Sequence, residues 1–235
     1  MKAPINEHKI VVFSGAGISA ESGLQTFRDA GGLWNEHKVE DVATLRGWQK
    51  DPQLVLDFYN SRKKEALNAQ PNAAHRAIAE LEKNYQVVVI TQNVDDLHER
   101  AGSTRVIHLH GQLNKACGSF DKNQSHDVTH RDINIGDLCD QGSQLRPHIV
   151  WFGERAENIG IARQHLKDAA KVLVVGTSLA VYPAAGILKK ARGRAEKLLV
   201  TLDVEKVPYG FKWLKNKAAE AVPHIVSRWM NEYEN

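Results

Sequence analysis

A glycine-rich segment follows the first apolar stretch of the chain and has the residue types of a phosphate-binding turn. Ile10 to Ser14 has the composition of a buried strand, and Gly15-Ala16-Gly17-Ile18-Ser19-Ala20 follows it directly. A strand that ends in a G-x-G-x-x-A turn can bring backbone amides and a helix N-terminus to a pyrophosphate. The acidic ribose-binding residue that usually follows about 20 residues later is missing. A tight turn without a ligand therefore remains an alternative.

One of the eleven histidines has the position expected of a catalytic base. His110 follows the apolar segment Val106 to Leu109 and precedes a glycine, at a strand end where open α/β sheets bind their ligands. Its imidazole has an ordinary pKa of about 6.5, so it is largely neutral near pH 7 and can accept a proton. His108 lies two residues earlier, within the apolar segment rather than at its end. We expect His108, His98 and His75 to be structural.

Six short segments rich in Val, Ile or Leu have the composition of buried parallel strands. They are Ile10 to Ser14, Val87 to Thr91, Val106 to Leu109, Ile149 to Phe152, Val172 to Val175 and Leu198 to Leu202. Helical periodicity lies between them, as in Ala74 to Leu81, and Asp51-Pro52 supplies a cap and a first-turn proline for another helix. The alternation predicts an α/β fold: a Rossmann-like doubly wound parallel sheet with a small inserted helical or irregular module.

Two stretches interrupt this alternation of strands and helices. Residues 34–69 form a long helical excursion, and residues 112–145 have little periodicity and contain both cysteines. Irregular stretches this long are uncommon as loops inside a compact domain. We therefore expect residues 1–33, 70–111 and 146–235 to form the Rossmann-like domain, with 34–69 and 112–145 as small-domain insertions.

The overall composition argues against several classes of function. The 235 residues include 31 basic and 28 acidic side chains, a net charge of +3, without a block of like charge that would bind nucleic acid. Residues 1–9 lack the apolar stretch of a signal peptide, and no segment approaches the roughly 20 apolar residues that span a bilayer. Two cysteines cannot form a disulfide framework. We expect a cytoplasmic enzyme without nucleic-acid or membrane partners.

Five segments, in order within residues 9–223, resemble the signature motifs of the sirtuin family of NAD-dependent protein deacylases. They are Gly15 to Asp29 (GAGISAESGLQTFRD), Thr91 to His98 (TQNVDDLH), His110-Gly111, Arg146 to Glu154 (RPHIVWFGE), and Gly176-Thr177-Ser178 with Val181-Tyr182-Pro183. The resemblance implies that the Rossmann-like domain binds NAD as cofactor and that acylated lysine side chains of proteins are the partners. It also implies a reaction that yields nicotinamide, O-acyl-ADP-ribose and free lysine.

The resemblance assigns roles to individual residues. His110 would be the general base, and Asn93 and Asp95 would complete the catalytic set by orienting ribose and nicotinamide. The expected cofactor-binding residues are Gly15, Ala16, Gly17, Ser19, Ala20, Phe27, Arg28, Gln92, Asn93, Val94, Asp95, Gly176, Thr177, Ser178, Asp203 and Ala218. The expected substrate-binding residues are Tyr59, Arg62, Val94, Val150, Phe152, Gly153, Glu154 and Val181. Asp203 stands where the family commonly has Asn, and a carboxylate can still accept from ribose hydroxyls.

Tyr59 and Arg62 lie three residues apart, on one face of a predicted helix. One interpretation is an ordinary amphipathic helix with an exposed arginine. The Tyr-x-x-Arg pair also resembles that of the sirtuin branch that removes succinyl and malonyl groups, where a guanidinium can bind a distal carboxylate bidentately. On this second interpretation we expect desuccinylase and demalonylase activity beside deacetylase activity.

The metal site of the family is incomplete in this sequence. Most sirtuins carry C-x2-C twice, but here Cys117 and Cys139 are the first members of pairs whose second cysteine is missing. Two thiolates are half of the usual four-ligand zinc site. His126, His130 or an Asp could complete it, although none has a diagnostic spacing. We expect the module to hold by its own packing, without zinc.

Other enzymes on the same fold are the main alternatives. An NAD glycohydrolase or ADP-ribosyltransferase would use the same pocket without an acyl-lysine groove. The segments 150–154 and 177–182 argue against it, because in sirtuins they hold the peptide backbone as an added strand. A hydride-transferring dehydrogenase is disfavoured by the missing acidic residue. A catalytically silent NAD-binding module is disfavoured by the presence of His110, Asn93 and Asp95.

Overall fold

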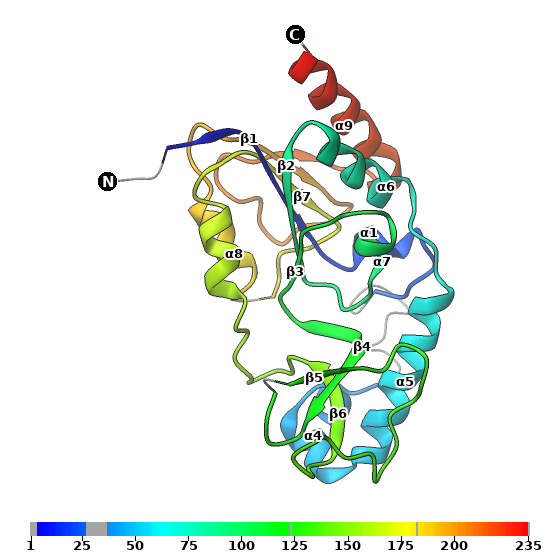
Figure 1. Cartoon of the computed structure of the whole chain (residues 1–235). Helices are drawn as coiled ribbons and strands as arrows, with labels where there is room; N and C mark the ends of the chain where they lie inside the picture. Colours follow the sequence, from blue (N-terminus) through cyan, green and yellow to red (C-terminus); the bar gives the residue numbers. More distant parts are fainter. Residues whose placement is uncertain (1–3, 27–36, 123, 182, 235) are drawn as a thin grey trace.

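The larger sheet of the protein contains six parallel strands (Figure 1). The computed structural model describes residues 4–26, 37–122, 124–181 and 183–234. The sheet order is β3-β2-β1-β7-β8-β9. The bounds of these strands are β1 Asn6–Ser14, β2 Gln86–Thr91, β3 Val106–His108, β7 Ala169–Val175, β8 Glu196–Val200 and β9 Lys212–Leu214. The predicted doubly wound parallel sheet is confirmed.

Helices cover both faces of this sheet, which explains the nearly continuous apolar strands. Ile10 and Val12 of β1 pack in one core with α6 and α9, whereas Val11 and Phe13 pack in the opposite core with α8 and η2. A strand buried on both faces has no polar side to alternate with its apolar side. The helices around the sheet are α1 Gly17–Ala20, α6 Ala73–Glu80, η1 Leu81–Lys83, α7 Leu97–Arg100, α8 Ile159–His165, η2 Ala185–Lys190 and α9 Ala218–Glu234.

A small module at one end of the sheet has its own core, which includes Leu56, Phe58, Leu145 and Trp151 (Figure 1). It combines helices with a three-stranded antiparallel sheet of order β5-β4-β6. Its elements are α3 Val39–Val42, α4 Leu45–Lys50, α5 Pro52–Asn68, β4 Gly111–Gly118, β5 Ser125–Asp127 and β6 Leu145–Ile149. The expectation of a parallel strand over 149–152 is wrong. The strand in this region is β6, which ends at Ile149 and pairs with β4.

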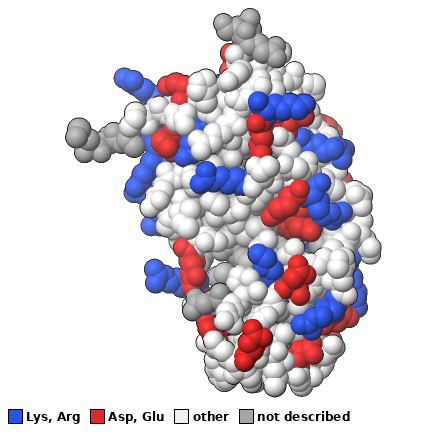
Figure 2. Space-filling model, viewed as in Figure 1, with Lys and Arg blue, Asp and Glu red and all other residues white. Residues whose placement is uncertain are grey.

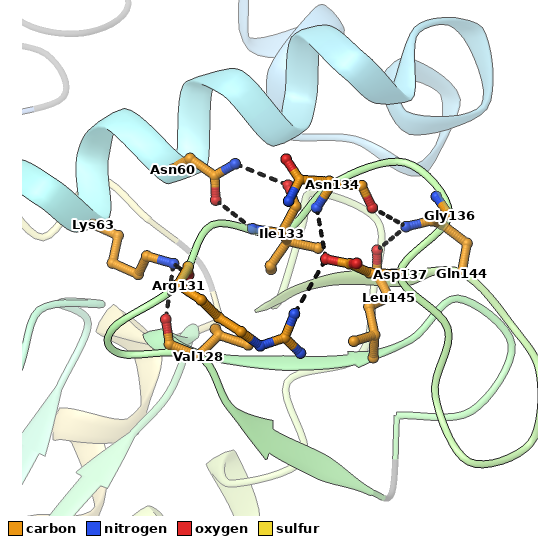
Figure 3. A network of polar contacts seen from close by, with 10 residues as sticks. All are labelled: Asn60, Lys63, Val128, Arg131, Ile133, Asn134, Gly136, Asp137, Gln144 and Leu145. Carbon is orange, nitrogen blue, oxygen red and sulfur yellow. Dashed lines mark hydrogen bonds and ion pairs between the residues drawn. The ribbon is translucent and has the colours of Figure 1, made fainter.

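Helix α5 is fixed at its start and along one face. The side chain of Asp51 accepts a hydrogen bond from Leu54 N at 3.0 Å, which confirms the predicted cap. Further along the helix, the amide of Asn60 exchanges two hydrogen bonds with the backbone of Ile133, at 2.9 and 3.0 Å (Figure 3). The ammonium of Lys63 donates to the carbonyls of Val128 and Arg131. These contacts set the rotation of α5 against the loop 128–133.

The surface carries basic and acidic side chains in mixed order. On the face drawn in Figure 2, Lys and Arg side chains lie interspersed with Asp and Glu side chains. This agrees with the nearly balanced net charge of +3. Within residues 4–26, 37–122, 124–181 and 183–234, no helix has both the length and the apolar character needed to span a bilayer.

Candidate active site

Two glycine turns meet at the carboxyl edge of the parallel sheet. Gly17 N, after β1, donates to Gly176 O, after β7, at 2.8 Å. A Cβ on Gly15 would lie 2.7 Å from Thr177 Cβ, and one on Gly176 would lie 2.1 Å from Ile18 N. Gly176 also has φ +63°, a conformation that favours glycine. The close approach of the two turns therefore requires these glycines and holds the start of α1 beside the end of β7.

A chain of polar side chains runs across the end of β2. Asn93 Nδ2 donates to Ser19 Oγ at 3.0 Å, and Ser19 Oγ donates to Asp95 Oδ2 at 3.1 Å. The other carboxylate oxygen of Asp95 accepts from Leu97 N at 3.2 Å. Burial raises the pKa of Asp95, although these hydrogen bonds oppose the rise. The structure thus brings three of the expected site residues into one hydrogen-bonded group.

Two polar atoms in this region have no hydrogen-bond partner within the described part of the chain. They are Gln92 Nε2, a donor, and Asn93 Oδ1, an acceptor. Both atoms are buried, and a buried polar group without a partner costs about 1–3 kcal/mol. A polar ligand that offers an acceptor to Gln92 and a donor to Asn93 would recover that cost. The pair therefore suits the amide and hydroxyl groups of a nucleotide.

His110 lies just beyond β3 and is half-buried. Its Nδ1 lies 3.1 Å from the carbonyl oxygen of Gln92. Because a carbonyl can only accept, Nδ1 carries the proton and Nε2 keeps its lone pair. Burial lowers the pKa of His110, and the hydrogen bond to Gln92 opposes this shift. The neutral ring, whose Nε2 has no hydrogen bond to the described residues, has the form required of a general base.

The three histidines expected to be structural are buried. His108 places its ring nitrogens 2.9 Å from Asn93 O and 2.7 Å from Glu99 Oε1. His98 Nε2 lies 2.9 Å from Ser14 Oγ, and burial lowers the pKa of His98. His75 belongs to the capping box of α6. Each ring thus has a contact that supports the fold around the site.

Arg62 reaches the same region from helix α5. It lines one pocket together with Ala16, Ser19, Asn93, Val94 and Asp95. The arginine side chain is only 11% exposed, so it is not the exposed surface charge of the simpler interpretation. Leu24, Gln25 and Leu113 also line this pocket and were not expected from the sequence. Leu24 and Gln25 lie within the sirtuin-like segment Gly15 to Asp29, which was the available signal, whereas Leu113 is one apolar residue of β4 among several.

Tyr59 lies one turn before Arg62 but has a different environment. Its hydroxyl accepts a hydrogen bond from Trp151 Nε1 at 3.2 Å. Burial raises the pKa of Tyr59 far above its ordinary value, so the phenol stays protonated and can donate. The structure thus places Tyr59 against the segment 150–154, while Arg62 lines the pocket beside Asn93 and Asp95.

The segment 150–154 runs beside His110. Val150 N donates to His110 O at 2.9 Å, and Phe152 N donates to Ala43 O at 3.0 Å. The carboxylate of Glu154 already has hydrogen-bond partners in the protein: it accepts from Trp151 N and from the buried Arg146 side chain, both at 2.9 Å. Phe152 and Gly153 are exposed. The backbone of this segment is therefore fixed while its outer side remains accessible.

Some of the remaining expected residues lie around the other strand ends. Gly176 N donates to Val200 O at 2.9 Å, so the segment 176–178 borders the end of β8. Asp203 follows that strand and is exposed, and Ala218 is the buried first residue of α9. Ala20 is exposed at the end of α1, and Val181 is partly buried. Phe27 and Arg28 lie outside the described residues.

The two cysteines lie in the small module. Cys117 is fully buried in β4, and burial raises the pKa of its thiol, which disfavours the thiolate that zinc binds. Cys139 Sγ lies 3.1 Å from Ser143 Oγ. Within the described ranges, no group of three or more His, Cys, Asp or Glu residues could hold a metal ion. The described residues of the chain therefore do not fit a zinc site.

Fold and site together define a Rossmann-like α/β protein with a polar pocket at the carboxyl edge of its sheet. The family model for the Sir2 family matches residues 15–183 of the chain. A protein of Bacteroides thetaiotaomicron named NAD-dependent protein deacylase is 51% identical over 196 residues, covering 81% of this chain and 84% of its own length. A Helicobacter pylori protein of the same name is 46% identical over 223 residues, covering 93% and 94%. The chain belongs to the Sir2 family.

Solved structures agree with this assignment. A mutant Sir2 homologue in complex with ADP-ribose has a TM-score of 0.87 at 38% identity, covering 96% of this chain and 93% of its own. A Sir2 homologue in complex with NAD has a TM-score of 0.84 at 38% identity, covering 96% and 90%. The predicted resemblance to sirtuins is confirmed at the level of the family.

Proposed function

We propose that this protein is an NAD-dependent protein-lysine deacylase that acts on acetyl-lysine and on lysine acylated with succinyl or malonyl groups. Membership of the Sir2 family and relatives named NAD-dependent protein deacylase support the first part. The observation that carries the second part is the buried Arg62, which lines a pocket with Asn93 and Asp95.

Several features of the chain suit NAD. Gln92 Nε2 and Asn93 Oδ1, which have no hydrogen-bond partner among the described residues, match the polar groups of a ribose and a carboxamide. The turns at Gly15 and Gly176 set backbone amides at the carboxyl edge of the sheet, where such folds bind dinucleotides. Bound NAD would supply a glycosidic bond to nicotinamide whose cleavage activates the ribose carbon towards an acyl oxygen.

The residues of the chain then have separate tasks. Asn93 orients the ribose, and Asp95, held by Ser19 and Leu97 N, accepts from the nicotinamide amide. His110 takes a proton from a ribose hydroxyl at its free Nε2, because Nδ1 is engaged with Gln92 O. The exposed outer side of 150–154 receives the peptide backbone as an added strand.

Arg62 binds the distal carboxylate of the acyl chain. A guanidinium forms two parallel charge-assisted hydrogen bonds with a carboxylate, and these are stronger in a pocket than in water. Tyr59, which stays protonated, contributes one further donor next to the peptide segment. An acetyl group has no carboxylate and leaves Arg62 in its present surroundings, so both substrate classes are accepted.

The test compares Arg62→Met on two peptides of one sequence that carry succinyl-lysine or acetyl-lysine. A contact to the distal carboxylate is present in ground and transition states alike, so its loss should raise KM for the succinyl peptide and change kcat less. A charge-assisted hydrogen bond contributes roughly 1.5–3 kcal/mol, so the rise in KM should be tenfold or more. Turnover of the acetyl peptide should stay within about threefold, because its acyl group makes no such contact. Tyr59→Phe should show the same pattern with a smaller change. Equal losses on both peptides would contradict the role of Arg62.

A further inference from the structure

Arg62 already has a carboxylate partner within its own helix. Its Nη1 lies 2.5 Å from Glu65 Oε2, one turn further along α5. The arginine side chain is 11% exposed and the glutamate side chain is 46% exposed, so the pair spans from the pocket to the solvent. We propose that Glu65 determines acyl specificity by competing with the distal carboxylate of the substrate for Arg62. This inference rests on the proposed function of Arg62.

The neighbouring cations on α5 are engaged with other partners. Lys63 is buried and donates to the carbonyls of Val128 and Arg131 (Figure 3). Lys64 is exposed and pairs with Asp132 at 2.7 Å. Arg62 lines the pocket beside Ser19 and Asn93, whereas Lys63, which lines an adjoining pocket, is held by two backbone carbonyls. Glu65 therefore controls the availability of Arg62.

The strength of the Arg62–Glu65 ion pair decides whether a substrate carboxylate can displace Glu65. A buried guanidinium without an anion is costly, so Glu65 stabilises Arg62 when the acyl group is neutral. The pair is half-exposed, however, and ion pairs in contact with water are weak. A substrate carboxylate that binds Arg62 bidentately inside the pocket can displace it. Ser61 Oγ donates to Glu65 Oε1 at 3.4 Å, which offers the released carboxylate a contact on the same helix.

Two consequences follow for the substrates. Acetyl-lysine is bound with the Arg62–Glu65 pair intact, so its binding does not depend on the charge of Glu65. Succinyl-lysine or malonyl-lysine must displace Glu65, and its carboxylate then lies close to a second negative charge. Glu65 thus lowers the affinity for acidic acyl groups and allows one pocket to serve both classes.

The experiment measures KM and kcat of Glu65→Gln on the same succinyl and acetyl peptides at saturating NAD. Removing a half-exposed competing charge should lower KM for the succinyl peptide about two- to fivefold and leave kcat within about twofold. KM for the acetyl peptide should not change. Asp57→Asn is the matched control, because Asp57 is an exposed carboxylate of the same helix that accepts from Gln53. It changes the net charge equally and should leave both KM values unaltered.

The outcomes separate this inference from the proposed function. An unchanged succinyl KM in Glu65→Gln, with a selective loss in Arg62→Met, would overturn the competition by Glu65 and leave the role of Arg62 intact. An equal loss on both peptides in Glu65→Gln would assign Glu65 a structural role and also overturn the inference. Equal losses on both peptides in Arg62→Met would remove the carboxylate site itself, and the competition with it.

Discussion

His110 is the residue on which the proposed chemistry depends most directly. Its Nδ1 is held by Gln92 O, and its Nε2 is the atom left to accept a proton. His108, two residues earlier, has both ring nitrogens beside Asn93 O and Glu99 and so serves the fold. The backbone of His110 also accepts from Val150 N, which couples the base to the proposed peptide-binding segment.

We expect His110→Gln to reduce the deacylation rate by about 10² to 10⁴, the usual contribution of a general base, while NAD binding is retained. Glutamine can keep a hydrogen bond to Gln92 O but cannot accept the proton. Because burial lowers the pKa of His110, the wild-type rate should fall only at pH values below about 6.5. Rates at several pH values and NAD titrations of both proteins check this. A mutant with near-normal turnover would remove His110 from the mechanism.

The sequence could predict that several of the candidate site residues lie close together, because they occur in ordered motifs at strand ends. The glycines of the two turns, Asn93, Asp95 and His110 come together at the sheet edge as parallel strands require. The environment of Arg62 could not be predicted in the same way. Its burial depends on the rotation of α5, which Asn60 and Lys63 set through backbone atoms of a distant loop. No local periodicity encodes such contacts.

At the scale of the elements, α5 belongs to the small module and carries Arg62, which lines the proposed acyl pocket. Asn60 and Lys63 bind the loop 128–133 on one side of the helix (Figure 3). In the same loop region, Asn134 N donates to Asp137 at 2.9 Å and Gly136 N donates to Gln144 at 2.7 Å. These polar contacts stabilise the part of the module in which the family usually places zinc ligands.

Lys63→Met should therefore lower the free energy of unfolding by about 1–3 kcal/mol, because two carbonyls lose a charged donor. Lys64→Met is the matched control, since it removes an exposed ion pair and should cost less than about 1 kcal/mol. Urea denaturation of both variants, with and without a chelator, measures the difference. Equal stabilities of the two variants, or unfolding of the wild type by chelator alone, would contradict this account.

Strands of the parallel sheet were predicted correctly from their short apolar segments, whereas the strand predicted near the small module was wrong. The strands around residues 10–14, 87–91, 106–109, 172–175 and 198–202 were found because they are short apolar segments. The same signal at 149–152 was misleading, because an apolar segment can equally line the module core. Strands β4, β5 and β9 were missed, since β5 and β9 have three residues each and β4 contains Gly, Gln, Asn and Lys.

At the scale of the whole molecule, buried neutral histidines make stability depend on pH. Burial lowers the pKa of His75 to about 4 and that of His98 well below its ordinary value. In the unfolded chain a histidine is protonated below about pH 6.5. In the folded protein, His75 is protonated only below about pH 4. The contribution of such a group is therefore present above pH 6.5 and is lost as the pH falls towards 4.

For His75 alone, the free energy of unfolding should fall by about 2 kcal/mol between pH 7 and pH 5. His75→Gln should lose this part of the pH dependence, whatever it does to stability at pH 7, because glutamine does not titrate. Urea denaturation of both proteins at pH 7, 6 and 5 gives the two slopes. The same slope in both proteins would show that His75 is protonated in the folded state or solvated more than its burial indicates.

The central claim, that this Sir2-family chain is a lysine deacylase, is tested most directly by peptide-dependent release of nicotinamide. The protein is incubated with NAD in the presence and absence of an acetyl- or succinyl-lysine peptide. Nicotinamide should appear in equal amount with deacylated peptide and O-acyl-ADP-ribose, and release without peptide should be much slower. Release at the same rate without peptide would identify an NAD glycohydrolase, and an absence of release with either peptide would identify a catalytically silent protein.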